Sequence, residues 1–345
     1  MALSRLWYGS VGLYKQDWEN DSSTRSFYPW RKKKFPVDWV DAFGFSGPLH
    51  VEVGFGDGRY LTDQAKAAAN ARFVGLEISG TSLYRAARRV RREGITNIRL
   101  LKVGAQFGLW HLFGHGEISS ITINFPDPWP KERHRTNRLL RHSFLEAASS
   151  RLKPLAKIKL ATDHFEYVVA AEEEVRATEL FDVILTEPPK EVFGTKYAQK
   201  WTSLGKPIYY REFENRGIAK QISRPSLERV KVMPHAILKG TLSNETASFE
   251  KSIQQYADGH VIIHEVAKTI GVSQFRWMFR VTVNDPELVQ QLLIVAHPRP
   301  DSNLIVRLET FGDPVITPTV RGAVHAVTEW LLDAVPSLVL LERNY

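Results

Sequence analysis

Residues 49–58 read LHVEVGFGDG, an apolar run that leads into a turn containing three glycines. The glycines occupy alternate positions: Gly54, Gly56 and Gly58. Glycine lets the backbone adopt turns that other residues rarely adopt, and the missing side chain lets a ligand come close to the chain. The segment therefore predicts a strand that ends in a ligand-binding turn, at the start of an α/β sheet.

The spacing of the glycines and two nearby acids indicate which ligand this turn binds. A dinucleotide-binding G-x-G-x-x-G pattern would need glycine at position 59, where the chain has Arg59. Glu52 would repel a pyrophosphate, but it suits the positively charged amino-acid end of S-adenosylmethionine. Glu77 ends the next apolar run about 20 residues on, where a carboxylate can accept hydrogen bonds from both ribose hydroxyls. We therefore predict an S-adenosylmethionine site.

Around this turn, residues 49–187 alternate between strand-like and helix-like patterns, which is typical of a parallel sheet covered by helices on both faces. We expect strands at 49–53, 72–77, 98–103, 118–124, 156–162 and 181–187, with the clearest helices at 79–93 and 137–152. Right-handed crossovers place the carboxyl ends of such strands at one edge of the sheet. Binding residues should therefore follow directly after the strands.

The pattern changes beyond about residue 216. We expect strands at 260–266 and 276–283 and helices at 286–294 and 319–334. Before the first strand, residues 27–36 are rich in aromatic and basic side chains. The sequence therefore predicts three parts, namely an N-terminal aromatic and basic arm (1–35), the α/β domain (36–216) and a small C-terminal α+β extension (217–345).

The composition is that of a globular chain, with 43% hydrophobic and 24% charged residues among 345. The chain has no cysteine, which excludes disulfides, zinc–thiolate sites and thiol catalysis, and we expect no metal site. The sequence shows neither a signal-peptide pattern nor an apolar run of about 20 residues. We therefore expect a cytoplasmic protein that does not enter a membrane. Its oligomeric state has no marker in the sequence.

The charge is unevenly distributed along the chain. The net charge is +8, and residues 1–215 hold 32 Lys and Arg against 25 Asp and Glu, whereas residues 216–345 hold 14 against 13. A basic surface favours a polyanionic partner such as nucleic acid.

The expected fourth strand runs into the loop FPDPWPKERHRTNR, residues 125–138. Its three prolines stiffen the loop, because proline joins neither a helix nor a strand ladder. Asp127 could accept hydrogen bonds from the N1–H and 2-amino groups of guanine, and Trp129 could contact the face of a base. The basic side chains that follow could bind phosphates: Lys131, Arg133, His134, Arg135 and Arg138.

The helix expected at 79–93 has two opposite faces. One is apolar, with Leu83, Ala86, Ala87 and Val90, and the other carries Arg85, Arg88, Arg89 and Arg92. The apolar face predicts core packing. The arginine face fits either a secondary RNA contact or an ordinary solvated surface.

Taken together, these motifs resemble the bacterial tRNA (guanine-N7)-methyltransferase family. The resemblance spans about residues 36–214 and is carried by EVGFG (52–56), GLE (75–77), FPDPWPKERH (125–134), ATD (161–163), TKY (195–197) and GKPIY (205–209). It implies a Rossmann-like class I methyltransferase with a mostly parallel sheet. It also implies methyl transfer from S-adenosylmethionine to N7 of a guanine in tRNA, at position 46 of the variable loop.

The resemblance also implies roles for individual residues. Asp127 and His134 would be catalytic, with His134 either a phosphate contact or a proton carrier. The cofactor would be bound by Glu52, Gly54, Gly56, Gly58, Glu77, Gly104 and Asp127. The tRNA would be bound by Lys131, Arg133, Arg138, Asp163, Thr195, Lys196, Tyr197 and Ala198.

Three positions depart from the family pattern. Members usually carry an acid near the adenine after the third strand, where this chain has Gly104, and a glutamate where it has Ala198. They also commonly carry a basic residue where this chain has Asn137, although Arg138 is adjacent.

Two other hypotheses stay open. One is a methyltransferase acting on another RNA or DNA base, because proline-rich loops after the fourth strand also serve amino-group methylation. The second is a catalytically silent RNA-binding protein, because of Gly104 and Ala198. The presence of Glu52, Glu77 and Asp127 argues against the second.

Overall fold

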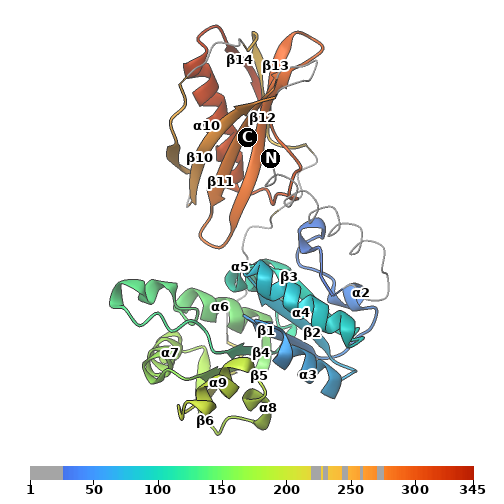
Figure 1. Ribbon diagram of the computed structural model, residues 1–345, viewed down its shortest axis with the longest axis vertical. Helices are drawn as coiled ribbons and strands as arrows, with labels where there is room; N and C mark the ends of the chain where they lie inside the picture. The colour runs from blue at the N-terminus through green and yellow to red at the C-terminus, as the bar shows by residue number, and fades with distance from the viewer. Residues whose placement is uncertain (1–25, 219–226, 228–231, 243–247, 257–258, 270–275) are drawn as a thin grey trace, which may run out of the picture. The chain divides into compact units, whose positions relative to one another are not determined.

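The computed structural model describes residues 26–218, 227, 232–242, 248–256, 259–269 and 276–345 (Figure 1). The chain divides into two compact units, residues 1–224 and 225–345. Most of the expected N-terminal arm, residues 1–25, lies outside the described residues.

The first unit is built on a sheet with the strand order β3-β2-β1-β4-β5-β7-β6. Its strands are β1 Leu49–Val53, β2 Arg72–Glu77, β3 Ile98–Lys102, β4 Ile118–Asn124, β5 Leu152–Thr162, β6 Phe181–Leu185 and β7 Tyr209–Asn215. Strands β1 to β5 pair in parallel, and β7 lies antiparallel between β5 and β6. This confirms the predicted mostly parallel sheet and the positions of the expected strands.

Helices cover both faces of this sheet. The longer ones are α3 Arg59–Ala67, α4 Gly80–Arg92, α5 Ala105–Leu112, α6 His142–Arg151, α7 Phe165–Thr178 and α9 Lys196–Ser203; the short ones are α2 Trp39–Phe43, α8 Lys190–Phe193 and the 3-10 turns η1 Trp30–Lys32 and η2 Glu132–Asn137. Phe73 in β2 packs in one core cluster with residues of α3 and α4. A Cβ on Gly108 of α5 would instead meet Leu76 of the same strand, at 3.0 Å. Since successive side chains of a strand point to opposite faces, α5 covers the other side.

The aromatic segment before β1 packs along the edge formed by β3 and α5. The backbone of residues 26–28 exchanges hydrogen bonds with Leu100, and the Trp30 ring lies 5.4 Å from that of Phe107. The indole of Trp30 also donates to the carbonyl of Lys102. The described part of the arm is therefore an ordered border of the sheet.

One predicted helix of the first unit is wrong in extent. The expected helix 137–152 forms only from His142 to Arg151, as α6: Asn137 ends the preceding turn η2, residues 138–141 are not helical, and Leu152 already belongs to β5. Arg138 is extended there because its buried guanidinium donates to carbonyls of the preceding loop.

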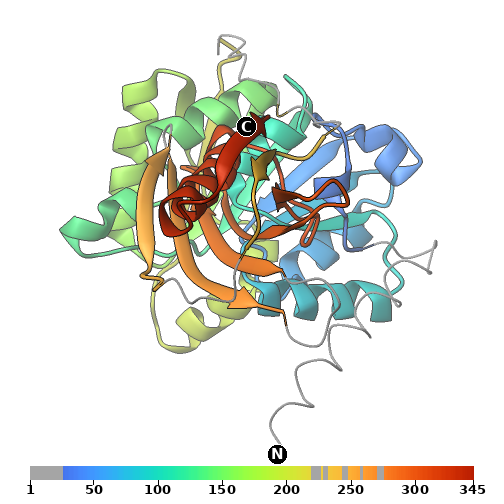
Figure 2. The same ribbon diagram turned by 90° about the horizontal axis from the view of Figure 1, so that it is seen from above.

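The second unit contains an antiparallel sheet with the order β14-β8-β13-β12-β11-β10-β9 and one helix, α10, among its described residues. The strands are β8 His235–Lys239, β9 Ser252–Tyr256, β10 Gly259–Lys268, β11 Trp277–Asn284, β12 Val289–Pro298, β13 Asn303–Leu308 and β14 Val339–Arg343. Helix α10, Pro318–Ala334, lies across one face, where it buries Val324, Val327 and Leu331 against Trp277 and Phe279 (Figure 2). The predicted α+β character is confirmed.

The helix predicted at 286–294 is wrong, because this segment forms most of β12. Asp285 and Leu288 exchange two backbone hydrogen bonds, so the chain turns there and runs back along β11. Gln290, Leu292 and Ile294 are buried at alternate positions, which is the period of a strand.

Within the described residues, no helix is both long enough and apolar enough to span a membrane. The described side chains also contain no group of three or more His, Cys, Asp or Glu positioned to hold a metal ion.

Candidate active site

The glycine turn between β1 and α3 presents open backbone. Gly54, Gly56 and Gly58 have φ angles of 69°, 56° and 74°, in the left-handed region that favours glycine. A Cβ built on Gly54 or Gly56 would meet nothing within 4 Å, so the backbone is accessible there. On Gly58 it would lie 2.7 Å from the Cβ of Ala86 in α4. Gly58 therefore fixes the turn against the helix, while the other two glycines leave room for a ligand.

We expect Gly58→Ala to destabilise the protein by about 2–3 kcal/mol, because alanine would add backbone strain and a clash with Ala86. Gly94→Ala is the matched control, since Gly94 has φ 62° but open space around its Cβ. It should lose only about 1 kcal/mol. Urea unfolding followed by circular dichroism measures both variants. Equal losses would show that contact with α4 does not matter.

Glu52 points into the sheet edge beside this turn and is almost completely buried, with 4% exposure. Its Oε1 accepts a hydrogen bond from Nδ2 of Asn124, at the end of neighbouring β4, over 3.4 Å. The other carboxylate oxygen and the Asn124 Oδ1 are buried and have no hydrogen-bond partner among the described residues. Burial raises the pKa of Glu52 to about 8. Two unpaired acceptors and a carboxyl group that lacks a counter-charge fit an ammonium group.

Glu77 ends β2 and ties the turn to the next helix. Its carboxylate accepts from the backbone N–H of Gly56, at 3.1 Å, and from that of Ser79, at 2.9 Å. Each carboxylate oxygen can accept a further hydrogen bond. Glu77 thus lies beside the open glycines, where a ribose would be bound.

Gly104 lies at the start of α5, after β3. Its φ of −66° and ψ of 143° are open to any residue, so the backbone does not require glycine here. The backbone could therefore carry the acid that the resemblance leads us to expect at this position.

The loop after β4 carries backbone strain. Phe125 and Trp129 adopt φ angles of 53° and 42°, which are unfavourable for aromatic residues. Such strain is common at functional sites and persists where surrounding contacts hold the chain. Asp127, between these two residues, is exposed.

Arg138 fixes the backbone of this loop by hydrogen bonds. Its side chain is buried, and its guanidinium donates to the carbonyl oxygens of Pro128, at 3.0 Å, and Trp129, at 3.4 Å. The guanidinium also lies 5.8 Å from the ring centre of Tyr167. This geometry differs from the predicted tRNA contact, because hydrogen bonds within the protein occupy the charged end.

The other basic residues of the loop face outward. Lys131 and Arg133 are exposed, and the Arg133 Nε donates to Nε2 of His134 at 3.2 Å. The His134 ring stands edge-on to Trp129, with the ring centres 5.8 Å apart. The structure thus brings together an acid, an aromatic ring and cationic side chains in one loop.

The segment around α9 lies next to this loop, since the ring of Tyr197 is 6.2 Å from that of Phe125. Thr195 caps the helix by accepting from the N–H of Ala198, at 3.1 Å. Lys196 and Tyr197 are exposed, but the Ala198 side chain is fully buried. The Ala198 side chain therefore packs beneath this surface, and the predicted contact with the tRNA would have to come from its backbone.

Asp163 follows directly after β5, and its Oδ2 lies 3.6 Å from the Lys206 Nζ. Because β5 pairs with β4, Asp163 belongs to the same edge of the sheet as Asn124. A carboxylate at this position can accept a hydrogen bond from a polar group of a substrate and stabilise positive charge that develops near it.

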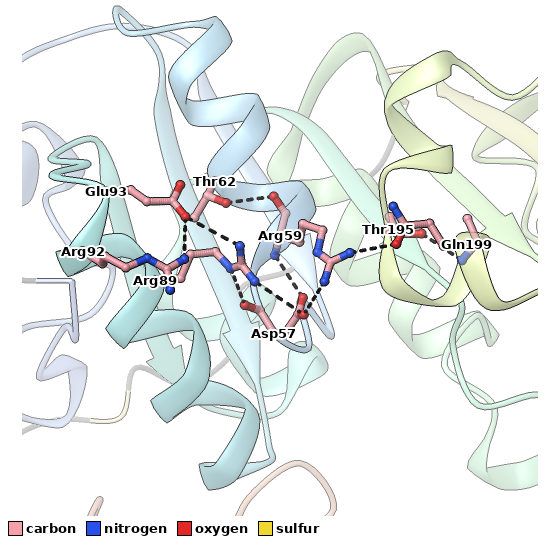
Figure 3. Close-up of polar contacts among 9 residues, drawn as sticks. Asp57, Arg59, Thr62, Arg89, Arg92, Glu93, Thr195 and Gln199 are labelled. Atoms are coloured by element: carbon pink, nitrogen blue, oxygen red, sulfur yellow. Dashed lines mark hydrogen bonds and ion pairs between the residues drawn. The ribbon is translucent and has the colours of Figure 1, made fainter.

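A hydrogen-bonded bridge that the sequence did not indicate joins the glycine turn to α9. Arg59 donates to the Gln199 Oε1 at 2.9 Å, and its other terminal nitrogen lies 3.6 Å from Asp57 in the turn (Figure 3). Asp57 also lies 3.7 Å from a guanidinium nitrogen of Arg89 in α4. Arg59 and Gln199 are 140 residues apart, so no local pattern could have paired them.

The strand order, the open glycine turn and the acids near the ends of β1 and β2, Glu52 and Glu77, define a class I methyltransferase, whose cofactor is S-adenosylmethionine. Residues 46–211 match the family model described as "Putative methyltransferase".

The chain is 37% identical to a tRNA (guanine-N(7)-)-methyltransferase of Thermus thermophilus over 303 residues, which are 88% of this chain and 95% of the relative. It is 36% identical to a protein of the same name from Deinococcus radiodurans over 288 residues, 82% of this chain and 89% of that one. A shorter relative from Bacillus velezensis is 34% identical over 181 residues, 51% of this chain and 83% of the relative. The chain belongs to the tRNA (guanine-N(7)-)-methyltransferase family.

The first two alignments are longer than the 224 residues of the first unit, so they extend into the second. The sequence motifs alone stopped near residue 214.

Proposed function

We propose that this protein transfers a methyl group from S-adenosylmethionine to N7 of a guanine in tRNA, with guanine 46 of the variable loop as the expected target. The observation that carries the proposal is the placement of Asp127 on the strained loop after β4, because β4 pairs with β1, the strand that carries Glu52. Because tRNA is a cytoplasmic molecule, we also place the protein in the cytoplasm.

The cofactor fits the chain's own groups. Glu52 and Asn124 would receive its ammonium group, Glu77 its ribose, and the open backbone at Gly54 and Gly56 would lie along it. When bound, the cofactor supplies an electrophilic sulfonium methyl group.

Guanine N7 already carries a lone pair, so no general base is needed. With the cofactor bound, this lone pair would form the new bond to the methyl carbon as the carbon–sulfur bond breaks, and the positive charge would then lie on the purine. Catalysis then depends on alignment and on stabilising that charge. Asp127 would accept from the N1–H and 2-amino groups, which orients the base and increases its electron density.

The remaining residues would position the RNA. Lys131, Arg133 and His134 would contact phosphates, and Asp163 would share the charge on the purine. Because Nε2 of His134 accepts from Arg133, a phosphate-side role agrees better with this geometry than proton transfer. Arg138 would act indirectly, by fixing the loop that carries Asp127.

The direct test incubates purified protein with unmodified tRNA and methyl-tritiated cofactor, followed by nucleoside analysis. We expect tritium in 7-methylguanosine, with chain cleavage at the modified position after borohydride and aniline. Tritium in an exocyclic methylamine would instead indicate a methyltransferase for another base. RNA binding without cofactor binding or methyl transfer would indicate a silent RNA-binding protein.

A further inference from the structure

Helix α4 carries arginines along its whole outer surface. Leu83, Ala86, Ala87 and Val90 are buried against the sheet, and the side chains of Arg85, Arg88 and Arg92 are exposed on the opposite side. At 1.5 Å per residue, the seven-residue interval from Arg85 to Arg92 spans about 10 Å. We call these three residues the α4 stripe.

The α4 stripe is poorly suited to a purely solvated role. Residues 80–92 contain no acid, so the arginines are neighbours of like charge at intervals of three and four residues. Such pairs destabilise a helix, whereas alternating charges would stabilise it. A helix selected only for solubility and stability would therefore carry acids among these arginines.

The acids near the α4 stripe are already shared by several cations. Glu93 contacts Lys66, Arg89 and Arg92, and these neighbours hold its pKa below the usual range, with the hydrogen bond from Lys66 the largest cause. Asp57 is shared between Arg59 and Arg89 (Figure 3). The surface around α4 therefore keeps an excess of positive charge.

The helix that carries the α4 stripe is joined to the cofactor turn through other residues. The Nε of Arg89 donates to the carbonyl of Asp57 at 3.3 Å, and Gly58 packs directly against Ala86. A long polyanion with one nucleotide at the active site could continue over this neighbouring helix. Guanidinium groups suit it because they bind phosphate oxygens in pairs.

We propose that the α4 stripe binds the phosphate backbone of the RNA substrate outside the nucleotide that reacts. The proposal rests on the proposed function, since it needs an RNA to be bound at the adjoining site. It assigns a role to α4 in affinity and orientation and none in the chemical step.

The test compares the triple variant Arg85→Gln, Arg88→Gln, Arg92→Gln with the wild type in tRNA binding at several salt concentrations. We expect Kd at low salt to rise by about tenfold or more, and the slope of log affinity against log salt to fall by about two to three. Cofactor affinity, measured calorimetrically with S-adenosylhomocysteine, and kcat at saturating tRNA should stay unchanged. Replacement of the same residues by lysine should restore most of the affinity.

The matched control removes three exposed arginines that have acidic partners: Arg176→Gln, Arg216→Gln and Arg280→Gln, which lose Glu172, Asp182 and Glu265 respectively. It changes the net charge equally, and its tRNA affinity should stay within about threefold of the wild type. Equal losses in both variants, or unchanged binding in the α4 variant, would overturn the proposal. A wild-type protein that does not methylate tRNA would instead refute the proposed function.

Discussion

Replacing Asp127 with alanine should slow methyl transfer by about 100- to 1,000-fold while tRNA affinity changes only a few-fold. The carboxylate is exposed on a loop that hydrogen bonds from buried Arg138 keep in place, so its loss should leave the loop intact. It should act mainly when positive charge develops on the purine, and therefore on the rate rather than on binding. Single-turnover methylation with enzyme in excess, together with filter binding, separates the two effects.

Asp63→Ala is a suitable control for this experiment, because Asp63 is an exposed acid of α3 outside the loop. It should retain the wild-type rate. Asp127→Asn should be impaired nearly as much as the alanine variant, since an amide offers one acceptor oxygen and no charge. A rate within threefold of the wild type for Asp127→Ala would remove this residue from the mechanism.

Cofactor affinity should rise with pH between about pH 6 and about pH 7.5, by up to tenfold per unit. The pKa of Glu52 is raised to about 8 by burial, so the carboxyl group is mostly protonated near neutrality without a ligand. An ammonium group bound beside it favours the ionised form, and binding then releases a proton. Calorimetry with S-adenosylhomocysteine in two buffers of different ionisation enthalpy measures that proton directly.

Glu52→Gln should weaken cofactor binding and abolish this pH dependence, yet stabilise the ligand-free protein. In the wild type, the pKa of Glu52 is about 4.5 in the unfolded chain and about 8 in the folded protein. The folded protein therefore loses no stability from this group below pH 4.5. It loses more as the pH rises, and the loss is complete above about pH 8. The variant avoids this loss and should be more stable by about 2–4 kcal/mol at pH 8. Thermal unfolding across this pH range tests the sign.

Glu117→Gln is the control that removes a carboxyl group with a raised pKa outside the cofactor site. Burial also raises the pKa of Glu117, but this residue precedes β4, at the opposite end of the strand from Asn124. Loss of the Glu117 carboxyl group should change neither the cofactor affinity nor the slope of log cofactor affinity against pH. If Glu52→Gln kept the wild-type slope, the ammonium site would have to be placed elsewhere.

The sheet of the first unit was predictable because each strand is a short apolar run bounded by turn residues. Errors arose where a local pattern was ambiguous or overridden. The segment at 286–294 contains apolar residues at both helical and strand spacings, and pairing with β11 decides in favour of the strand. The helix expected from 137 starts late because Arg138 turns inward to the Asp127 loop.

The site was predictable where chemistry is concentrated in one segment, as in the glycine turn. It was not predictable where function depends on burial or on distant partners. The sequence predicted that Arg138 and Ala198 bind the tRNA, which requires an exposed position. Only the fold shows that both side chains are buried. Asn124 could not be predicted as a site residue from the sequence, because it joins the site only through its hydrogen bond to Glu52 on the adjacent strand.

The position of β7 between β5 and β6 bears on how the protein is made. In the described part of the chain, β6 pairs only with β7, and β7 is the last strand of its sheet to be synthesised. During translation the edge of β5 therefore stays open until residue 215 has left the ribosome, and any fragment that ends before residue 209 lacks the strand that joins β6 to the sheet. A nascent chain is thus exposed to strand-pairing errors until synthesis of this unit is almost complete.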